Sequence, residues 1–144
     1  MIQFRPATLD DSEFLYNLKK RTLKEYITQI WGWDEKDQHN YHKENFNPEK
    51  FSIIQLNGED IGCMSIEEHP NKIRLNMIEI SPEYQNKGIG SKLIRDLIEK
   101  GSQEKKTIEL QVFKVNNEAF RLYTTLGFKL IDETETHYKM VFHR

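Results

Sequence analysis

The sequence predicts a mixed α/β fold, with a central, mostly antiparallel sheet flanked by about four helices. Short alternating apolar segments, which are typical of strands, are interspersed with segments whose apolar residues recur at helical spacing. Between residues 73 and 113 a strand, a glycine-bearing turn, a helix and a second strand follow one another, which predicts one parallel strand pair. The expected order is β-α-α-β-β-β-α-β-α-β-β, in a single domain over residues 1–144.

The chain begins with a strand and a long helix. Alternation predicts a strand at Ile2–Pro6. A helix is expected from about Asp10, because apolar residues from Phe14 onwards recur every three or four positions. Asp10, Asp11 or Ser12 is expected to cap its N-terminus, since short polar side chains accept hydrogen bonds from the first helical N–H groups.

A second helix and a hairpin follow. Asp34 is expected to cap a very polar helix that reaches about Phe46. Strands are then predicted at Phe51–Leu56 and Ile61–Glu68. They flank Asn57-Gly58, and an Asn-Gly pair is a strong signal for a two-residue hairpin turn.

The second half alternates strands and helices before a final strand pair. The expected elements are a strand at Lys72–Ile80, a helix from Ser91 to about Glu99 with Gly101 as its stop, a strand at Thr107–Phe113, a helix over Asn116–Leu126, and strands at Phe128–Asp132 and about Thr136–Phe142.

Composition excludes several classes of function. The net charge of −2 argues against nucleic acid as a main partner. No apolar run approaches membrane-spanning length, and the N-terminus has no secretory pattern, so no membrane partner is expected. The single cysteine, Cys63, lies in an alternating strand and reads as a buried thiol, and a cytoplasmic location is the simple inference. His39 and His42 are predicted to lie on a polar helix surface, and no metal is expected.

The most informative segment is Gln85-Asn-Lys-Gly-Ile-Gly90, between a predicted strand and a predicted helix. The N–H groups of a first helical turn have no intrahelical partners, and the helix dipole favours an anion there. Gly88 and Gly90 have no Cβ, so a phosphate can approach the backbone. A dinucleotide fold would require a third glycine where Leu93 stands, and a P-loop would require Gly-Lys-Ser/Thr. The segment predicts a different phosphorylated cofactor.

This hexapeptide resembles the acyl-CoA-binding signature of the GNAT N-acetyltransferase superfamily, Q/R-x-x-G-x-G/A. Asn116–Tyr123 is similar to a second family signature, N-x-x-A-x-x-L-Y, and Leu126-Gly-Phe128 follows it as in the family. The resemblance covers essentially the whole chain. It implies the GNAT fold, in which the fourth and fifth strands splay apart, and it implies acetyl-CoA as the cosubstrate.

The resemblance also implies which residues bind the cofactor. The backbone of Ile78 and Ile80 would pair with the pantetheine arm, and the Ile80 N–H would hold the thioester carbonyl. Asn116 aligns with an asparagine that binds the arm, and Tyr123 with a tyrosine that protonates the leaving thiolate; alternatively, they are an N-cap and a core aromatic. The pyrophosphate would lie on the backbone amides of Gln85, Asn86, Lys87, Gly88, Ile89, Gly90 and Ser91.

The general base is not fixed by the resemblance. Some relatives carry a catalytic glutamate in the fifth strand, where Gln111 aligns and cannot act as a base, although Glu109 is near. Glu79 in the fourth strand is a candidate, but alternation places it on the face opposite Ile78 and Ile80. A water-mediated base or a carboxylate from the N-terminal helices is the alternative.

The acceptor is expected near the segment between the first two helices, which lines the acceptor side in this family. Here it holds Trp31, Trp33 and Asp34, and aromatic faces beside a carboxylate suit a cationic amine. The alternative is that Trp31 continues an apolar helix face while Asp34 only caps. His137 and Tyr138, on the last predicted hairpin, are secondary candidates.

The sequence thus predicts an acetyl-CoA-dependent N-acetyltransferase acting directly on a primary amine of a small molecule or a protein. The chain is expected to be a monomer or a homodimer. A non-catalytic acyl-CoA sensor on the same fold is the alternative, against which Tyr123 argues, because a sensor needs no phenol at the sulfur. The acceptor itself is not specified by the fold.

Overall fold

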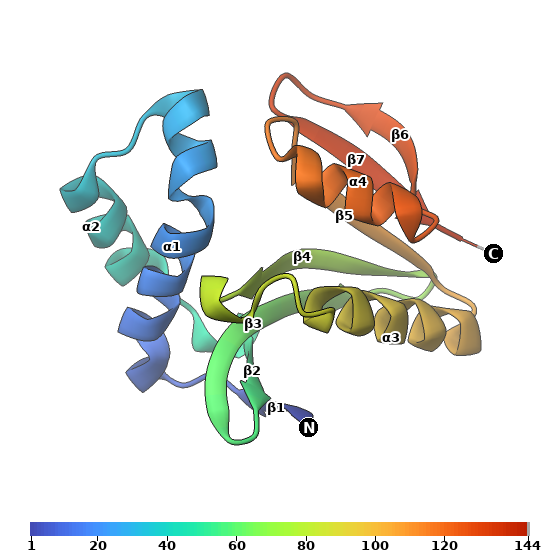
Figure 1. Ribbon diagram of the computed structural model, residues 1–144, viewed down its shortest axis with the longest axis horizontal. Helices are drawn as coiled ribbons and strands as arrows, with labels where there is room; N and C mark the ends of the chain where they lie inside the picture. The colour runs from blue at the N-terminus through green and yellow to red at the C-terminus, as the bar shows by residue number, and fades with distance from the viewer. Residues whose placement is uncertain (144) are drawn as a thin grey trace. The chain divides into compact units, whose positions relative to one another are not determined.

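A computed structural model describes residues 1–143. Contacts divide the chain into two compact units. The first unit contains Met1–Ser65 and Met77–Gln85, and the second contains Ile66–Asn76 and residues 86–143. The strands form one seven-stranded sheet in the order β1-β2-β3-β4-β5-β7-β6 (Figure 1).

The predicted order of strands and helices is confirmed. The strands are β1 Ile2–Pro6, β2 Ser52–Leu56, β3 Glu59–Glu68, β4 Lys72–Ile80, β5 Thr107–Phe113, β6 Lys129–Glu133 and β7 His137–Phe142. The helices are α1 Ser12–Trp31, α2 Glu35–Asn45, α3 Ile89–Glu104 and α4 Asn117–Thr125, with short 3₁₀ turns η1 Leu9–Asp11, η2 Pro48–Lys50 and η3 Pro82–Tyr84.

In the first unit, β1, β2 and β3 are antiparallel neighbours. Asn57 and Gly58 both have positive φ, 52° and 86°, as a type I′ turn requires, so the predicted hairpin is confirmed. The strands support a core in which Leu15 and Leu18 of α1 pack with Ile53 and Cys63. Cys63 is buried in β3, as predicted, and its burial raises the pKa of the thiol.

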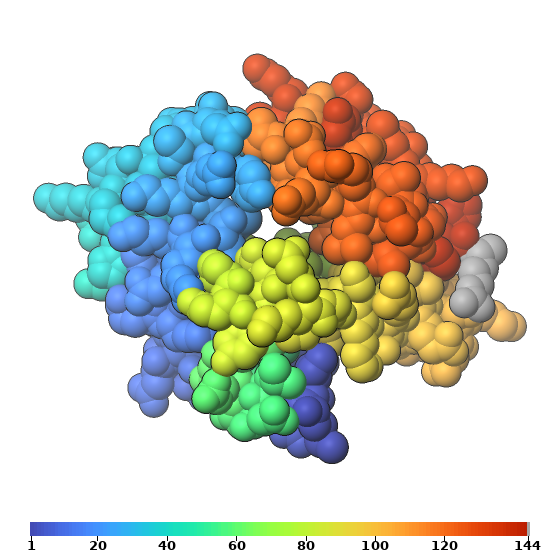
Figure 2. Space-filling model, viewed as in Figure 1, coloured from blue at the N-terminus to red at the C-terminus, as the bar shows by residue number. Residues whose placement is uncertain are grey.

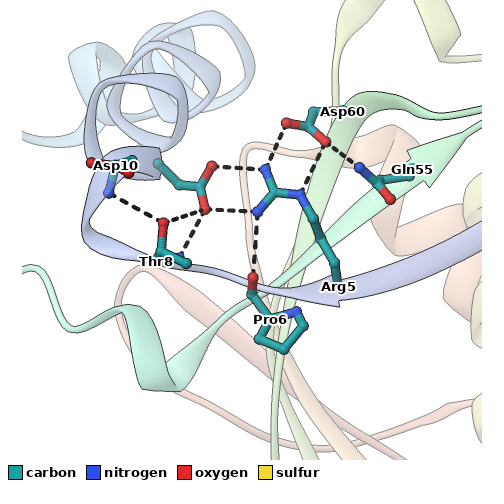
Figure 3. A network of polar contacts seen from close by, with 7 residues as sticks. Arg5, Pro6, Thr8, Asp10, Gln55 and Asp60 are labelled. Atoms are coloured by element: carbon teal, nitrogen blue, oxygen red, sulfur yellow. Dashed lines mark hydrogen bonds and ion pairs between the residues drawn. The ribbon is translucent and has the colours of Figure 1, made fainter.

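The start of α1 differs from the prediction. Asp11 occupies the N-cap position but makes no capping hydrogen bond. Its carboxylate instead accepts two hydrogen bonds from the Arg5 guanidinium, at 2.9 and 2.8 Å, and one from the Thr8 N–H, at 2.8 Å (Figure 3). The Thr8 side chain accepts from Asp10 N and caps η1. The sequence offered Asp10, Asp11 or Ser12 as the cap, and it did not predict the ion pair of Asp11 with Arg5, because that pair depends on how β1 and the start of α1 pack.

In the second unit, α3 packs against β5. The prediction that Gly101 ends this helix is wrong, because α3 continues to Glu104 and ends where Lys105 takes a left-handed conformation, φ 58°. Gly101 is buried inside α3. A Cβ there would lie 2.8 Å from Ile108 Cδ1 and 2.9 Å from Lys106 O, so the glycine allows a close approach of the helix to β5.

β4 and β5 form the expected parallel pair, and the sheet is splayed between them. The pairing joins Lys72–Leu75 to Thr107–Leu110. β5 then pairs with β7, and β7 with β6, in antiparallel fashion. α4 lies over this part of the sheet (Figure 1), and the rings of Phe120 and Tyr138 are 4.8 Å apart across the contact.

Candidate functional site

The N-terminus of α3 has the features of an anion site. Gly88 is the N-cap residue with φ 81°, and no side chain caps the helix. The first helical bond runs from Lys92 N to Gly88 O at 3.0 Å, so the N–H groups of the preceding turn have no partner within the helix. The first turn contains no acidic side chain, which leaves the positive end of the helix dipole uncompensated.

Space for a ligand is present at this turn. A Cβ built on Gly88 or Gly90 would meet nothing within 4 Å. The side chains from Gln85 to Lys87 are exposed, and the yellow-green segment around residues 80–95 lies on the surface seen in Figure 2. A phosphate can therefore reach the backbone here, so the residues present fit the predicted pyrophosphate of a CoA.

The end of β4 is held by local hydrogen bonds. Gln85 Nε2 donates to the Ile80 carbonyl at 2.8 Å, and Ser81 N donates to the Ile61 carbonyl at 2.7 Å. The side chain of Gln85 thus fixes the turn that follows β4. The Gln85 N–H, one of the predicted phosphate donors, already donates to the Pro82 carbonyl at 3.2 Å.

Gly62 is a positioning residue that was not singled out from the sequence. It is buried in β3, and a Cβ there would lie 2.2 Å from the carbonyl oxygen of Glu79 and 3.3 Å from Ile80 Cα. Only glycine lets β3 approach β4 at the residues predicted to hold the thioester. The signal was present, because a glycine inside a strand often marks a close backbone approach.

α4 places Asn116 and Tyr123 in the second unit. Asn116 is the N-cap, and its Oδ1 accepts from Ala119 N at 3.1 Å. Tyr123 is 9% exposed and lies edge-on to Phe128 at 5.7 Å. Burial raises the pKa of the Tyr123 phenol to about 12, so it holds its proton at neutral pH. The structure thus shows Asn116 as an N-cap and Tyr123 as a core aromatic, which were the structural alternatives for these two residues. Their contacts with a cofactor stay predictions.

Glu79 is the most unusual carboxyl group of the first unit. It is 4% exposed, and its Oε2 is buried without a hydrogen-bond partner among residues 1–143. Desolvation raises its pKa to about 7, although the Lys19 charge and the Thr22 hydroxyl act in the opposite direction. A carboxyl group with such a pKa exchanges protons near neutral pH, as a general base must.

Glu109 lacks the properties of a base. It forms ion pairs with Lys72 Nζ at 3.0 Å and with Lys139 Nζ at 3.2 Å. Its hydrogen bond with Lys72 is the main reason that its pKa lies below the usual value. The carboxylate is therefore ionised and already paired.

The tryptophan segment between α1 and α2 is already engaged in internal contacts. Trp31 is 63% exposed, so it does not continue a buried apolar face. The indole N–H of Trp33 donates to Glu35 Oε1 at 3.3 Å, and Lys24 Nζ lies 5.8 Å from the centre of its ring. Asp34 caps α2 by accepting from Asp37 N at 2.9 Å, which confirms that expectation.

His137 and Tyr138, the secondary candidates for contact with the acceptor, also have partners within the chain. His137 Nδ1 is 2.7 Å from Thr136 Oγ1, its ring is tilted against that of Phe113 with the centroids 4.5 Å apart, and burial lowers its pKa. Lys114 Nζ lies 5.3 Å from the centre of the Tyr138 ring. Whether any of these residues contacts an acceptor stays a prediction.

The histidines of α2 serve structure. His39 Nε2 pairs with Glu13 Oε1 at 2.9 Å, and His42 Nε2 lies 2.9 Å from the Ser12 carbonyl. Within residues 1–143, no three His, Cys, Asp or Glu side chains are grouped so that they could hold a metal ion. Among the helices of this range, none combines the length and the apolar character needed to cross a bilayer.

Comparison with solved structures shows that this fold recurs among acetyltransferases. The PaiA N-acetyltransferase from Thermoplasma acidophilum, in complex with coenzyme A, is similar over 98% of each chain, with 22% identity and a TM-score of 0.77. An acetyltransferase from Thermus thermophilus is similar over 99% of this chain and 96% of its own, with 15% identity and a TM-score of 0.75.

A protein-level acetyltransferase is among the similar structures as well. The ribosomal-protein-S18-alanine N-acetyltransferase from Escherichia coli has 19% identity and a TM-score of 0.67 over 98% of this chain and 92% of its own. No curated protein matches the sequence. The model of the acetyltransferase (GNAT) family, however, matches residues 13–128. The chain therefore belongs to the GNAT acetyltransferase family, whose members transfer acyl groups from acyl-CoA.

Proposed function

We propose that the protein is an acetyl-CoA-dependent N-acetyltransferase that transfers the acetyl group directly to a primary amine. The observation that carries the proposal is the uncapped N-terminus of α3. Its orphan N–H groups, its lack of acidic side chains and the open space at Gly88 and Gly90 suit a pyrophosphate.

The remaining contacts of the cofactor follow the same proposal. The backbone of Ile78 and Ile80 pairs with the pantetheine amides, and the Asn116 side chain binds the arm while it caps α4. Lys87, exposed beside the glycines, adds a positive charge near the phosphates.

When bound, acetyl-CoA supplies an activated thioester, and the chain supplies the proton transfers. The Ile80 N–H stabilises the negative charge that develops on the carbonyl oxygen. Glu79 takes one proton from the acceptor ammonium, so that the free amine can attack. Tyr123 gives its proton to the leaving sulfur, and the proton that the nitrogen loses as the amide forms restores the phenol. The products are an amide, a CoA thiol and one proton.

The alternative function is an acyl-CoA sensor that binds but does not transfer. Tyr123 favours the enzyme, because a sensor needs no phenol at the sulfur, whereas a protonated, largely buried phenol suits a proton donor to the leaving thiolate. The two functions differ in one measurement, which is release of CoA thiol in the presence of an amine.

The test uses Gly90→Val, because Gly90 has open space around it and, unlike Gly88, no positive φ that would strain a side chain. Isothermal titration is expected to show that the wild type binds acetyl-CoA. The affinity of the variant should be lower by at least about tenfold, or about 1.4 kcal/mol. Ser102→Val, on the same helix, is the control and should bind normally. Equal affinity in a folded Gly90→Val protein would exclude this placement.

A further inference from the structure

A cavity of about 180 Å³ lies in the first unit beside Glu79. This volume is far above the ~15 Å³ that a single water needs. α1 contributes Leu15 and Lys19, and α2 contributes Tyr41, His42 and Asn45; the rest of the lining comes from the chain that follows α2 and from β3 and β4. The cavity thus lies wholly within the first unit and does not include the nucleotide-side turn of α3.

Glu79 supplies a buried carboxyl oxygen without a hydrogen bond in this cavity. Its Oε2 is the buried side-chain oxygen without a hydrogen-bond partner in residues 1–143, and the residue is 4% exposed. Leaving such a group without a partner destabilises the fold, and more so when the group is charged. Lys19 lines the same cavity, and its charge favours the ionised carboxylate without outweighing the desolvation of Glu79.

The rest of the lining is largely apolar. Phe46, Phe51 and Met77 line the cavity together with Leu15. A small group with several N–H donors and a positive charge would satisfy the carboxylate, and an apolar body would displace water from the aromatic and thioether surface. A primary ammonium on a compact apolar body combines the two properties.

We infer that this cavity seats the acceptor of the reaction, as an ammonium on Glu79, and that the acceptor is a compact primary amine with an apolar body. The inference rests on the proposed function, since it assumes that an amine is acetylated. It goes further by choosing a position and a chemical class for that amine.

The tryptophan segment is the rival position for the acceptor. From Lys19 to Trp31 α1 rises about 18 Å, so a compact amine cannot contact both places. At the tryptophan segment the ring of Trp33 already faces Lys24, and the Asp34 carboxylate already caps α2. The buried carboxyl oxygen that lacks a hydrogen-bond partner among residues 1–143 is Glu79 Oε2, and this decides between the two positions.

Four other titratable groups line the cavity and bear on its pH dependence. They are Lys19 of α1, Tyr41 and His42 of α2, and Cys63 of β3. Burial lowers the pKa of His42, and burial raises that of Cys63, so both are mainly neutral at pH 7. Lys19 carries a positive charge and competes with a cationic ligand. Because the free Glu79 carboxyl has a pKa of about 7, ammonium binding should strengthen as pH rises from 5.5 to about 8 and should release a proton near pH 7.

The test measures binding of benzylamine and n-butylamine by isothermal titration, without acetyl-CoA and in buffers of different ionisation enthalpy. The neutral benzyl alcohol serves as the uncharged probe. Wild type should bind the amines more tightly than the alcohol, and Glu79→Gln should lose at least about tenfold of amine affinity, or about 1.4 kcal/mol, together with its pH dependence. Lys19→Gln should bind the amines more tightly, because a competing cation is gone.

Glu44→Gln, an exposed position of α2, is the control and should match the wild type. Amine binding that is absent in the wild type, or unchanged in Glu79→Gln, overturns the inference. So does a loss of benzylamine affinity in Trp33→Ala with none in Glu79→Gln. Failure of CoA binding or CoA release, with benzylamine binding intact, counts against the proposed function and leaves the amine site standing.

Discussion

Tyr123 illustrates how one side chain meets two demands. Its ring packs on Phe128, which makes it part of the core of the second unit, and its phenol is the proposed acid. A phenylalanine would supply the same ring at this place, so packing alone does not require the hydroxyl. The phenol oxygen is what the proposed proton transfer requires.

Replacement of Tyr123 by Phe separates the two demands. Stability should stay the same or rise, since only a largely buried hydroxyl oxygen is removed. The affinity for acetyl-CoA should change little, while kcat falls on the order of 100-fold or more, because the leaving thiolate loses its proton donor. Thermal melting and CoA-release kinetics measure the two effects. A variant with unchanged kcat would return Tyr123 to a purely structural role.

At the scale of one element, α3 shows how local rules and packing conflict. Gly101 stands near the end of the apolar pattern, where a glycine usually marks a helix terminus. The helix instead continues to Glu104, because Gly101 lets it approach Ile108 of β5 closely. Local sequence signals cannot distinguish these two uses of glycine, since the second depends on a neighbouring strand.

The two interpretations of Gly101 predict changes of opposite sign in the free energy of unfolding when Gly101 is replaced by Ala. By helix propensity alone, alanine would stabilise α3 by about 1 kcal/mol. A Cβ only 2.9 Å from the backbone oxygen of Lys106 and 2.8 Å from Ile108 Cδ1 should instead cost about 1–3 kcal/mol through overpacking, so we expect a net loss of up to about 2 kcal/mol. Urea unfolding measures this change in the free energy of unfolding. Ser102→Ala, the next residue, is the control and should be neutral or slightly stabilising; a stabilised Gly101→Ala protein would refute the packing argument.

The local geometry of the candidate anion site at the other end of α3 was predictable, because the residues that form it are neighbours in sequence. A strand end, two glycines and a helix start lie within a few residues, and the structure has the expected uncapped turn at Gly88. The hairpin at Asn57-Gly58 was predictable for the same reason. The surroundings of Glu79 were not, because the cavity is lined by α1, α2, β3 and β4, which are distant in sequence.

At the scale of the whole chain, the N-terminal strand is tied in by one arginine. Arg5 of β1 contacts the carboxylates of Asp11 and Asp60, with Nη2 2.8 Å from Asp11 Oδ1 and 2.7 Å from Asp60 Oδ2 (Figure 3). Gln55 of β2 donates to the same Asp60 at 2.8 Å. The network joins β1, the start of α1 and the β2–β3 hairpin, and the Asp11 side chain is only 10% exposed. It explains why Asp11 does not cap α1.

Removing this arginine by Arg5→Met should destabilise the protein by about 1–3 kcal/mol, because two neighbouring carboxylates lose their shared cation and Asp11 is largely buried. Arg5 holds the pKa values of Asp11 and Asp60 below their usual value, so this stabilisation is present near neutral pH and is lost as pH falls below about 4. The difference in the free energy of unfolding between wild type and variant, measured in urea, should therefore narrow from pH 7 to pH 3.

Arg21→Met, which breaks an exposed ion pair with Glu83, is the control and should lower the free energy of unfolding by less than about 1 kcal/mol. A difference that does not depend on pH would mean that the ion pairs of Arg5 with Asp11 and Asp60 do not stabilise the N-terminal strand.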